Sequence, residues 1–546
     1  MFKFIDNLEA KFSLGRTTMI IAGLTIISRA TGFLRDLLLA SNLGASQNAD
    51  IYFTSFRLPD LIYNLIILGT LSAAFLPVFT EYYIKDRNHA KQIASSVFNL
   101  AVGAMAFVAL LLFIFAKPLT QLIAPGFDQE ALSQTVTITR ILLLSPIIFT
   151  ASSVVSSTLL SLKKFIWVNT APVLYNAGII FGLFILYPKY QLVGLALGVI
   201  IGACLHILIQ LPQLRSLGFW WQPIILWRSL AVKKILKLFV PRIFGLDISY
   251  VNLVIVSIVG SLLGTGAIAA FNYASNIQSV PLGVFALSTT IAVFPVLAES
   301  HAKQDYVAFL NNFKTAFVRI IYFVMPFSVL MLLLRAYIVR VLIGYGQCDW
   351  GCTINTFDTL GVLTVSLVAQ SLISLLSRAF YARQNTKTPV MVSILAMIVN
   401  AIFSYWLSLA LGVIGIALGF VIASVLQFGI LVTLFHKELR YIPGLSKKYV
   451  KSFDYYIILT STQIVFSATV MGFLSYLSLY LISPVIDNST VIGILIQTSF
   501  ACLVAFITYV YISSAMHIPE AVKIKSALSK TMKFFNVSGI EQNTQL

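Results

Sequence analysis

The stretch "SRATGFLRD", residues 28–36, lies inside an apolar run that extends from about residue 15 to residue 43. It places Arg29, Arg35 and Asp36 where a membrane-spanning helix normally carries no charge. A lone charge at that depth costs several kcal/mol, so such residues usually pair with each other or face a water-filled cavity. The rest of the sequence bears on which of these two arrangements applies.

The composition is that of a membrane protein. Of the 546 residues, 59% are hydrophobic and only 10% are charged, and the mean hydropathy is +0.92, whereas soluble proteins carry about a quarter charged residues. The net charge of +18 does not indicate nucleic-acid binding, because Lys and Arg recur in short segments between apolar runs. The sequence therefore predicts an all-α polytopic membrane protein.

Fourteen apolar runs reach the length of about 20 residues that a helix needs to cross a bilayer. The first run has no small-residue cleavage site and is followed by thirteen more, so we expect an uncleaved helix and not a signal peptide. The predicted transmembrane helices are 15–43, 51–80, 93–116, 133–160, 168–187, 193–212, 235–261, 266–297, 316–343, 357–381, 389–411, 413–435, 455–482 and 490–513.

The basic residues are divided unequally between the two sides of these spans. With the N-terminus inside, 28 of the 37 Lys and Arg residues fall in inner segments, four fall in outer loops and five lie within spans. Positive charge accumulates on the cytoplasmic side of membrane proteins. We therefore expect both termini in the cytoplasm.

The second half of the chain repeats features of the first in the same order. "GLALGVIIGACLH" (194–206) matches "GIALGFVIASVLQ" (415–427), and "AAFLPVFTE" (73–81) resembles "IAVFPVLAE" (291–299). These pairs, together with Pro172 and Pro389, predict two six-helix lobes related by a pseudo-two-fold axis along the membrane normal. The expected parts are an N-terminal lobe (1–225), a C-terminal lobe (226–450), two C-terminal helices (451–515) and a basic cytoplasmic tail (516–546).

Further charges lie at the depth of the opening stretch. Counted along a helix that rises about 1.5 Å per residue, Arg29 lies near the midplane, Arg35 and Arg57 lie in the outer half, and Asp50 lies at the mouth of the second span. Three arginines against Asp36 and Asp50 leave an excess of positive charge, and guanidinium groups in a cavity suit an anion, a diphosphate best of all. The alternative is a structural clamp, in which an Asp neutralises an Arg.

Other polar residues carry less specific signals. Arg140, near the outer end of the fourth span, is expected to extend to the membrane surface. Arg242 and Asp247 are about 140° apart on a helix, and Asp247 would serve as a proton or cation site or as the partner of Arg242. Cys348 and Cys352 would form a disulfide in an oxidising compartment, or remain free thiols.

The sequence has no pattern for a nucleotide or a metal. It contains no G-x-x-x-x-G-K-[ST] loop, its five histidines lack metal-ligand spacing, and no Ser/His/Asp order stands out. We therefore expect no cofactor, no metal site and no enzymatic activity. Two lobes related by a pseudo-two-fold axis are typical of transporters, and without a nucleotide motif such a transporter would be powered by the membrane potential or by a gradient of Na+ or H+.

The segment "SRATGFLRDLLLASNLGASQNADIYFTSFRLPDLIYNLIILGTLSAAFLPVFTEY" (28–82) resembles the N-terminal signature of the MurJ (MviN) lipid II flippases, a family of the multidrug/oligosaccharidyl-lipid/polysaccharide (MOP) exporter superfamily. The resemblance covers nearly the whole chain. Further matching blocks are "APGF" (124–127), "RILLLSPIIF" (140–149), "YNAGII" (175–180) and "RAFYARQNTKTPV" (378–390).

The resemblance implies a flippase of the cytoplasmic (inner) membrane. Its substrate would be lipid II, an undecaprenyl-diphosphate-linked disaccharide-pentapeptide that a cell needs to make peptidoglycan. The protein would move lipid II from the inner to the outer leaflet by alternating access. The two lobes would form a V-shaped cationic cavity, and residues 451–515 would form a groove for the lipid tail. Functionally important residues of the family match Ser28, Arg29, Arg35, Asp36 and Asp50.

Two arginines of the family pattern are absent from this chain. "LPDLIYN" has Tyr63 and Asn64 where the family usually has Arg, and "NYASNIQSVP" has Asn276 where it often has Arg. Arg57, and in the second half Arg242, would restore the charge of the cavity. The family positions at Gly69 and Pro77 match, and packing or bending roles are expected for them.

Three other functions compete with lipid II transport. A flippase for another polyprenyl-diphosphate-linked glycan would use the same cationic site. A cation-coupled drug exporter of the superfamily would need an acidic, aromatic-lined cavity, against which the three arginines argue. A membrane scaffold would need no unpaired charge at the midplane. The expected partners are a polyprenyl-diphosphate-linked sugar, membrane lipids and a coupling ion, and no nucleic acid.

Overall fold

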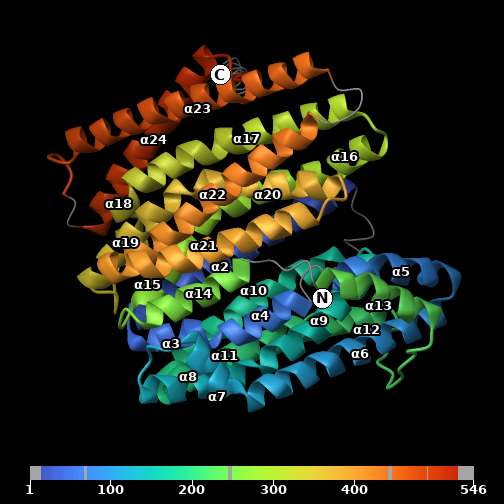
Figure 1. The fold of residues 1–546 in the computed structure, drawn as a ribbon. Coiled ribbons are helices and arrows are strands. Elements are labelled where there is room, and N and C mark those ends of the chain that lie inside the picture. The colour runs from blue at the N-terminus through green and yellow to red at the C-terminus, as the bar shows by residue number, and fades with distance from the viewer. Residues whose placement is uncertain (1–13, 67–70, 244–248, 441–445, 488–489, 527–546) are drawn as a thin grey trace, which may run out of the picture. The chain divides into compact units, whose positions relative to one another are not determined.

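The computed structural model describes residues 14–66, 71–243, 249–440, 446–487 and 490–526. Within these ranges the regular structure consists of α-helices and two short π-helices, with no strand (Figure 1). A helix satisfies its backbone hydrogen bonds within one segment, which is what a chain surrounded by lipid requires. The expectation of an all-helical fold is confirmed.

By their internal contacts the described residues form two compact units. Unit 1 comprises the chain up to Ala270 together with 345–349, and within it the long helices lie side by side (Figure 1). Its helices are α2 (Leu14–Leu43), α3 (Gln47–Ser55), α4 (Arg57–Ile66), α5 (Leu71–Lys85), α6 (Arg87–Ile114), α7 (Ala116–Ile123), α8 (Gln129–Leu142), α9 (Leu144–Ser161), α10 (Phe165–Phe181), η1 (Gly182–Leu186), α11 (Tyr187–Leu208), α12 (Leu211–Ser216), α13 (Leu230–Ile243) and α14 (Ser249–Ser261).

Unit 2 comprises 271–344 and the chain from Trp350 onward. The helix α15 (Ala267–Pro281) begins in unit 1 and continues into unit 2. The other helices of unit 2 are η2 (Leu282–Leu287), α16 (Ser288–Ala302), α17 (Tyr306–Leu333), α18 (Arg335–Ile343), α19 (Trp350–Val365), α20 (Leu367–Ala382), α21 (Lys387–Leu411), α22 (Val413–Leu439), α23 (Lys447–Ile482) and α24 (Val491–Ala515). The two units are defined by contacts within each of them. The predicted lobes, with their boundary at 225/226, are defined by the sequence repeat, and that boundary stays a prediction.

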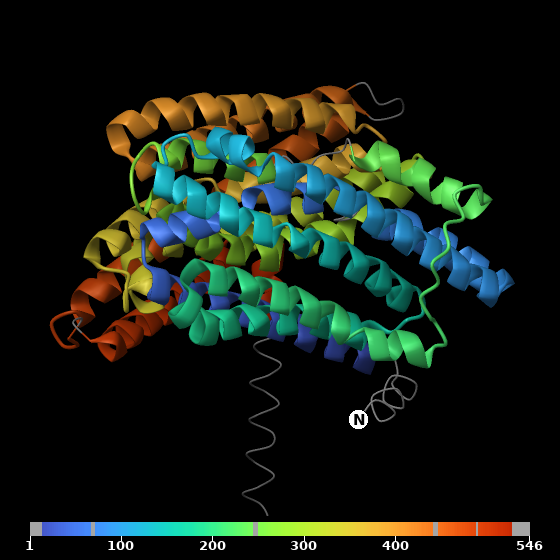
Figure 2. The same ribbon diagram turned by 90° about the horizontal axis from the view of Figure 1, so that it is seen from below.

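Residues 217–229, which connect α12 to α13, are largely non-helical and are bonded to α6 (Figure 2). Trp221 Nε1 donates to Asn99 Oδ1 over 2.8 Å, and the Leu226 amide donates to Ser96 Oγ over 2.8 Å. Beyond the connection, Lys234 of α13 forms an ion pair with Glu81 of α5 over 2.9 Å. Hydrogen bonds from Lys234 and Lys85 hold the pKa of the Glu81 carboxyl below its ordinary value. These bonds explain why α13 belongs to unit 1.

Nine helical segments among the described residues are long and apolar enough to cross a membrane, or ten if the bent pair α19–α20 counts as one span. One of them, Phe165–Ser216, joins two predicted spans across a break. Four predicted spans are not among the nine: 15–43, 51–80, 235–261 and 357–381, the last of which corresponds to the bent pair. A multi-pass helical protein is thereby confirmed, and the count of fourteen stays a prediction.

The first charged stretch lies in an unbroken helix. Although Gly32 and Pro59 are residues at which a helix can bend, α2 continues through Gly32, and the break in the second run falls at Phe56, between α3 and α4. Pro59 lies in the first turn of α4, where its missing N–H removes no helical hydrogen bond. Gly69 lies outside the described residues.

The sequence repeat reappears as repeated backbone geometry within each unit. A Cβ added at Gly194 would collide with the carbonyl of Leu186, and one at Gly415 with the backbone of Leu407, so both glycines allow a close helix approach. The two glycines occupy matching positions of the two sequence copies, and so do the two leucines. The ion pairs Glu81–Lys85 and Glu299–Lys303 likewise lie at matching positions.

A backbone break precedes each of these glycines. Gln191 has φ 49° and ψ −134°, and Gly412, at the matching position of the second copy, has φ 58° and ψ −135°. This region of φ/ψ space is adopted with ease only by glycine, and another residue there costs about 1–3 kcal/mol. The first copy therefore has a strained Gln where the second has Gly.

Gly412→Ala is expected to destabilise the protein by about 1–3 kcal/mol, whereas Gln191→Gly is expected to be neutral or stabilising. The first change introduces a Cβ into the strained conformation, and the second removes one. The measurement is the melting temperature of each purified variant in detergent. A Gln191→Gly variant that melts well below the wild type would show that the Gln side chain itself is needed.

Cys348 and Cys352 are disulfide-bonded, while Cys204 and Cys502 are free. The disulfide is thus the alternative that the structure supports for the first pair. Cys204 lies in α11 and Cys502 in α24.

Candidate functional site

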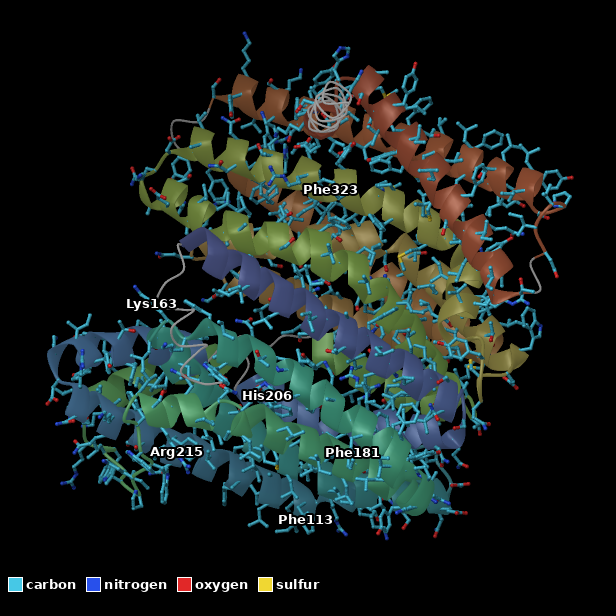
Figure 3. The ribbon with its side chains drawn as sticks, turned by 180° about the vertical axis from the view of Figure 1, so that it is seen from behind. Phe113, Lys163, Phe181, His206, Arg215 and Phe323 are labelled. Carbon is cyan, nitrogen blue, oxygen red and sulfur yellow. The ribbon has the colours of Figure 1, made fainter. Side chains whose placement is uncertain are left out.

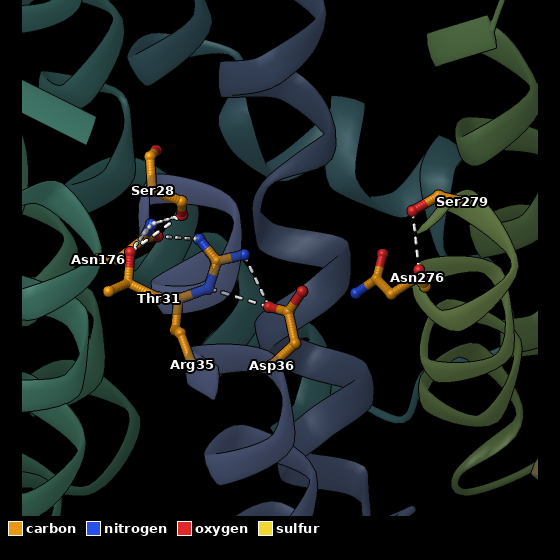
Figure 4. Close-up of polar contacts among 7 residues, drawn as sticks. All are labelled: Ser28, Thr31, Arg35, Asp36, Asn176, Asn276 and Ser279. Atoms are coloured by element: carbon orange, nitrogen blue, oxygen red, sulfur yellow. Dashed lines mark hydrogen bonds and ion pairs between the residues drawn. The ribbon is translucent and has the colours of Figure 1, made fainter. Parts of the chain in front are cut away.

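Arg35 lies at the centre of a polar cluster between α2 and α10 (Figure 4). Its Nε and Nη2 donate to Oδ1 of Asp36 over 2.9 and 2.7 Å, and its Nη1 donates to Oδ1 of Asn176 over 2.9 Å. The first partner is the next residue on the same helix, and the second comes from α10, 141 residues later. The guanidinium is therefore anchored on two sides.

These anchors do not use all the donors of Arg35. A guanidinium has five N–H donors, and three of them are engaged here, which leaves two. The side chain is 23% exposed. Arg35 can therefore still donate two hydrogen bonds to an oxyanion, as a phosphate requires.

Asn176 is a member of the cluster to which sequence reasoning assigned no role. It is only 6% exposed, and its Nδ2 lies 3.4 Å from both the Ser28 carbonyl and the Thr31 hydroxyl (Figure 4). Ser28 thus joins the cluster through its backbone. The signal in the sequence was a lone Asn in the apolar run "APVLYNAGIIF", which contains one of the family blocks.

Arg29 differs from Arg35 in its surroundings. It is exposed, and it makes no hydrogen bond or ion pair within the part of the chain that the structure describes. Six residues separate it from Arg35, which is about 9 Å along the helix axis and about 120° around it. The charge of Arg29 therefore lies on a neighbouring face of α2 and not in the Arg35 cluster.

Asp50 caps a helix. Its carboxylate accepts hydrogen bonds from the amides of Gly266 (2.6 Å) and Ala269 (2.8 Å) at the start of α15, and the residue is 2% exposed. Gly266 has φ 87°, and a Cβ there would collide with the Ala45 carbonyl, so this position accepts only Gly and has no capping side chain of its own. Asp50 supplies the missing cap from α3.

Asp50→Ala is expected to lower the stability of the folded protein by about 2 kcal/mol, the upper end for loss of an N-cap, because two amides lose a charged acceptor. Asp50→Asn keeps one acceptor oxygen and is expected to lose less. The melting temperatures of the two variants, compared with the wild type, test this. Equal melting temperatures for wild type and Asp50→Ala would contradict the capping role.

Arg57 is buried within unit 1, at 6% exposure, and its Nε donates to Ser257 Oγ of α14 over 2.8 Å. Asp60, one turn further along α4, interacts electrostatically with both Arg57 and Arg35. Asp60 lies in "RLPD" and adds a third carboxylate to those of Asp36 and Asp50. In the observed packing Arg57 joins two helices, and a contact between Arg57 and a ligand stays a prediction.

The charge balance of the predicted site is therefore different from the one we expected. Asp36 pairs with Arg35, Asp60 interacts with both Arg57 and Arg35, and Asp50 is engaged by backbone amides. With Asp60 included, three arginines stand against three aspartates, so the expected excess of positive charge is absent. What remains for a ligand is Arg29, which is unpaired within the described residues, and the two open donors of Arg35.

The remaining predicted residues are not brought into this cluster. The side chain of Arg242 and the whole of Asp247 lie outside the described residues. Tyr63, at one position of a missing family arginine, packs its ring 5.5 Å from that of Phe149. The carbonyl of Asn276 accepts a hydrogen bond from Ser279 over 2.7 Å within α15 (Figure 4).

A separate cavity of about 490 Å³ lies in unit 1, lined by residues of α6, α8 and α9 and by Leu143 between them. Its lining is apolar except for Thr137 and Arg140. Arg140 donates from Nε to the Phe113 carbonyl over 3.3 Å and lies 5.0 Å from the centre of the Phe113 ring. Phe113 lies at the periphery of the unit (Figure 3). The Arg140 side chain thus interacts with the end of α6. That it extends to the membrane surface stays a prediction.

Comparison with known families gives a consistent match. The family model described as lipid II flippase MurJ matches residues 39–486. A probable lipid II flippase MurJ of Buchnera aphidicola subsp. Acyrthosiphon pisum is 30% identical over 509 residues, which cover 91% of this chain and 96% of the relative. The lipid II flippase MurJ of Burkholderia cenocepacia is 28% identical over 428 residues, 76% of this chain and 82% of the relative.

Solved structures show the same fold. A lipid II flippase MurJ in an inward closed conformation matches with a TM-score of 0.74 at 24% identity, covering 91% of this chain and 99% of that one. A multidrug resistance MATE family transporter of the MOP superfamily matches with a TM-score of 0.61 at 16% identity, covering 80% and 99%. With a family model that spans most of its length and a relative of 30% identity along nearly all of it, the chain belongs to the lipid II flippase MurJ family.

Proposed function

We propose that this protein is a flippase that moves lipid II, or a closely related polyprenyl-diphosphate-linked sugar, from the inner to the outer leaflet of the cytoplasmic membrane. Membership of the MurJ family supports the substrate class. The observation that carries the proposal is the state of the arginines on α2: Arg35 keeps two open donors, and Arg29 is exposed and unpaired within the described residues.

These arginines fit the chemistry of a diphosphate. A diphosphate offers several charged oxygens, and guanidinium groups bind them through paired, charge-assisted hydrogen bonds. Arg35 would donate two bonds from a fixed position, and Arg29 would add an unneutralised charge about 9 Å away along α2. The described part of the chain has no group of three or more His, Cys, Asp or Glu side chains that could hold a metal ion.

The architecture proposed for transport follows from the repeat. Two six-helix lobes within fourteen transmembrane helices would alternate between inward and outward openings, with both termini in the cytoplasm. The similar backbone breaks at Gln191 and Gly412, at matching positions of the repeat, support two copies of one unit. Residues 451–515 would accommodate the lipid tail, residues 516–546 would lie at the inner membrane surface, and the membrane potential or a gradient of Na+ or H+ would supply the energy in place of a chemical reaction.

The test is depletion of the protein in cells, followed by labelling of lipid II in the outer leaflet. We expect surface-exposed lipid II to fall while total lipid II rises, and expression of the wild-type protein to reverse both changes. Unchanged exposure of lipid II on depletion would contradict the proposal.

A second arm distinguishes the substrate. The neutral residues Tyr63 and Asn276 at two family arginine positions leave open another polyprenyl-diphosphate-linked glycan. If depletion lowers the exposure of such a glycan and not of lipid II, the flippase mechanism holds and the substrate is the other glycan.

A further inference from the structure

We propose that Asn176 is a positioning residue. Its amide oxygen, on α10, accepts a hydrogen bond from the Arg35 guanidinium and fixes the orientation of that group. Because the amide is neutral, it adds no second negative charge to that of Asp36. The inference rests on the proposed function, because the orientation matters only if Arg35 receives a diphosphate. It assigns a role to a residue of α10, a helix outside the charged stretch of α2.

The geometry requires a second anchor. Asp36 engages Nε and Nη2 through one oxygen, Oδ1, and it lies on the same helix as Arg35. Asn176 engages Nη1 from a different helix, over 2.9 Å. Because the two contacts act on different edges of a planar group, they restrict its rotation, and the two remaining N–H groups keep fixed directions (Figure 4).

Burial makes this anchor rigid. Asn176 is 6% exposed, and its Nδ2 lies 3.4 Å from the Ser28 carbonyl and from the Thr31 hydroxyl, which are two turns and one turn before Arg35 on α2. The amide orientation is therefore consistent with its neighbours: oxygen toward the guanidinium and nitrogen toward the two acceptors. A cation bound to a neutral, preorganised acceptor keeps its charge for a ligand.

The chemical identity of the acceptor is the specific claim. Arg35 already has one carboxylate partner in Asp36, and Asp60 lies within electrostatic range. A second carboxylate in direct contact would make the Arg35 cluster net negative, which repels a diphosphate. An amide of the same shape avoids this. If the role of Asn176 were only structural, aspartate would lower the melting temperature, because it has no Nδ2 donor for the two acceptors on α2, but it would leave the affinity of the folded protein for lipid II unchanged.

The experiment measures the affinity of purified protein in detergent for lipid II, by native mass spectrometry, together with the melting temperature of each variant. Asn176→Asp is expected to weaken binding at least about tenfold, and Asn176→Ala by less, because it removes the anchor without adding charge. The matched control is Asn169→Asp, two turns earlier on α10. Its amide Nδ2 bonds to the carbonyl of Phe165, and the residue lies about 10 Å from Asn176 along the helix axis. This variant is expected to bind like the wild type.

A charge swap keeps the proposal testable if Asn176→Asp folds poorly. The double variant Asp36→Asn with Asn176→Asp again surrounds Arg35 with one carboxylate and one amide, and it is expected to bind more tightly than Asn176→Asp alone. Wild-type affinity in Asn176→Asp, or a swap that binds no better than Asn176→Asp, would overturn the inference. A wild-type protein that does not bind lipid II would instead contradict the proposed function.

Discussion

Arg35→Ala is expected to abolish rescue of cells depleted of the wild-type protein. Arg35 supplies both donors that remain open in the cluster, and no neighbouring side chain of the cluster is a cation that could replace them. Loss of two charge-assisted hydrogen bonds amounts to about 3–6 kcal/mol of substrate binding, which is more than a hundredfold in affinity. The measurement is growth of the depleted strain together with surface labelling of lipid II.

Arg35→Lys separates charge from geometry. Lysine keeps the positive charge but has only three donors and no planar fork, so it cannot keep the three bonds that Arg35 makes to Asp36 and Asn176 and also donate to a phosphate. We expect partial rescue at high expression and none at the native level. Full rescue by Arg35→Ala, with normal amounts of protein in the membrane, would show that the guanidinium of Arg35 is not part of the transport site.

Arg57→Ala is expected to have the second largest effect, and to act through folding. The guanidinium of Arg57 is buried, bonds to Ser257 and interacts with Asp60. Loss of one partner of a buried charged pair costs about 3–5 kcal/mol, and because Asp60 is only partly buried we place Arg57→Ala at the lower end of that range. The melting temperature of the purified variant, and its amount in the membrane, should both fall clearly.

A double variant tests this explanation. Adding Asp60→Asn removes the charge that Arg57→Ala leaves uncompensated, so Arg57→Ala with Asp60→Asn is expected to be more stable than Arg57→Ala alone. Should Arg57→Ala instead retain the wild-type melting temperature and lose lipid II binding, Arg57 would contact the substrate directly, as the sequence first suggested.

The fold class could be predicted from composition and periodicity because a bilayer permits few solutions. Long apolar runs in lipid must form helices, and the described residues do so. The exact spans were harder to predict, since breaks such as Phe56 or Gln191 depend on local backbone geometry that hydropathy does not encode. The repeat was visible in the sequence because close helix packing requires glycine at the same positions twice.

The polar site was predictable in its residue types but not in its pairings. The cost of charge in a membrane singled out Arg29, Arg35 and Asp36 as candidates, and their contact with a substrate stays a prediction. It could not show that Asp50 caps the distant helix α15, because that contact depends on the tertiary fold. Asn176 was missed for the same reason: an uncharged residue carries no strong penalty, so its role depends on what lies opposite.

The central claim is that open guanidinium groups of α2 bind the diphosphate of a lipid-linked sugar. Its most direct test is the affinity of purified protein for undecaprenyl diphosphate and for undecaprenyl monophosphate, with the wild type compared with a variant carrying Arg29→Ala and Arg35→Ala. We predict that the wild type binds the diphosphate more tightly than the monophosphate and that the double variant loses this preference while remaining folded. A folded double variant that keeps the wild-type affinity and preference would contradict the account.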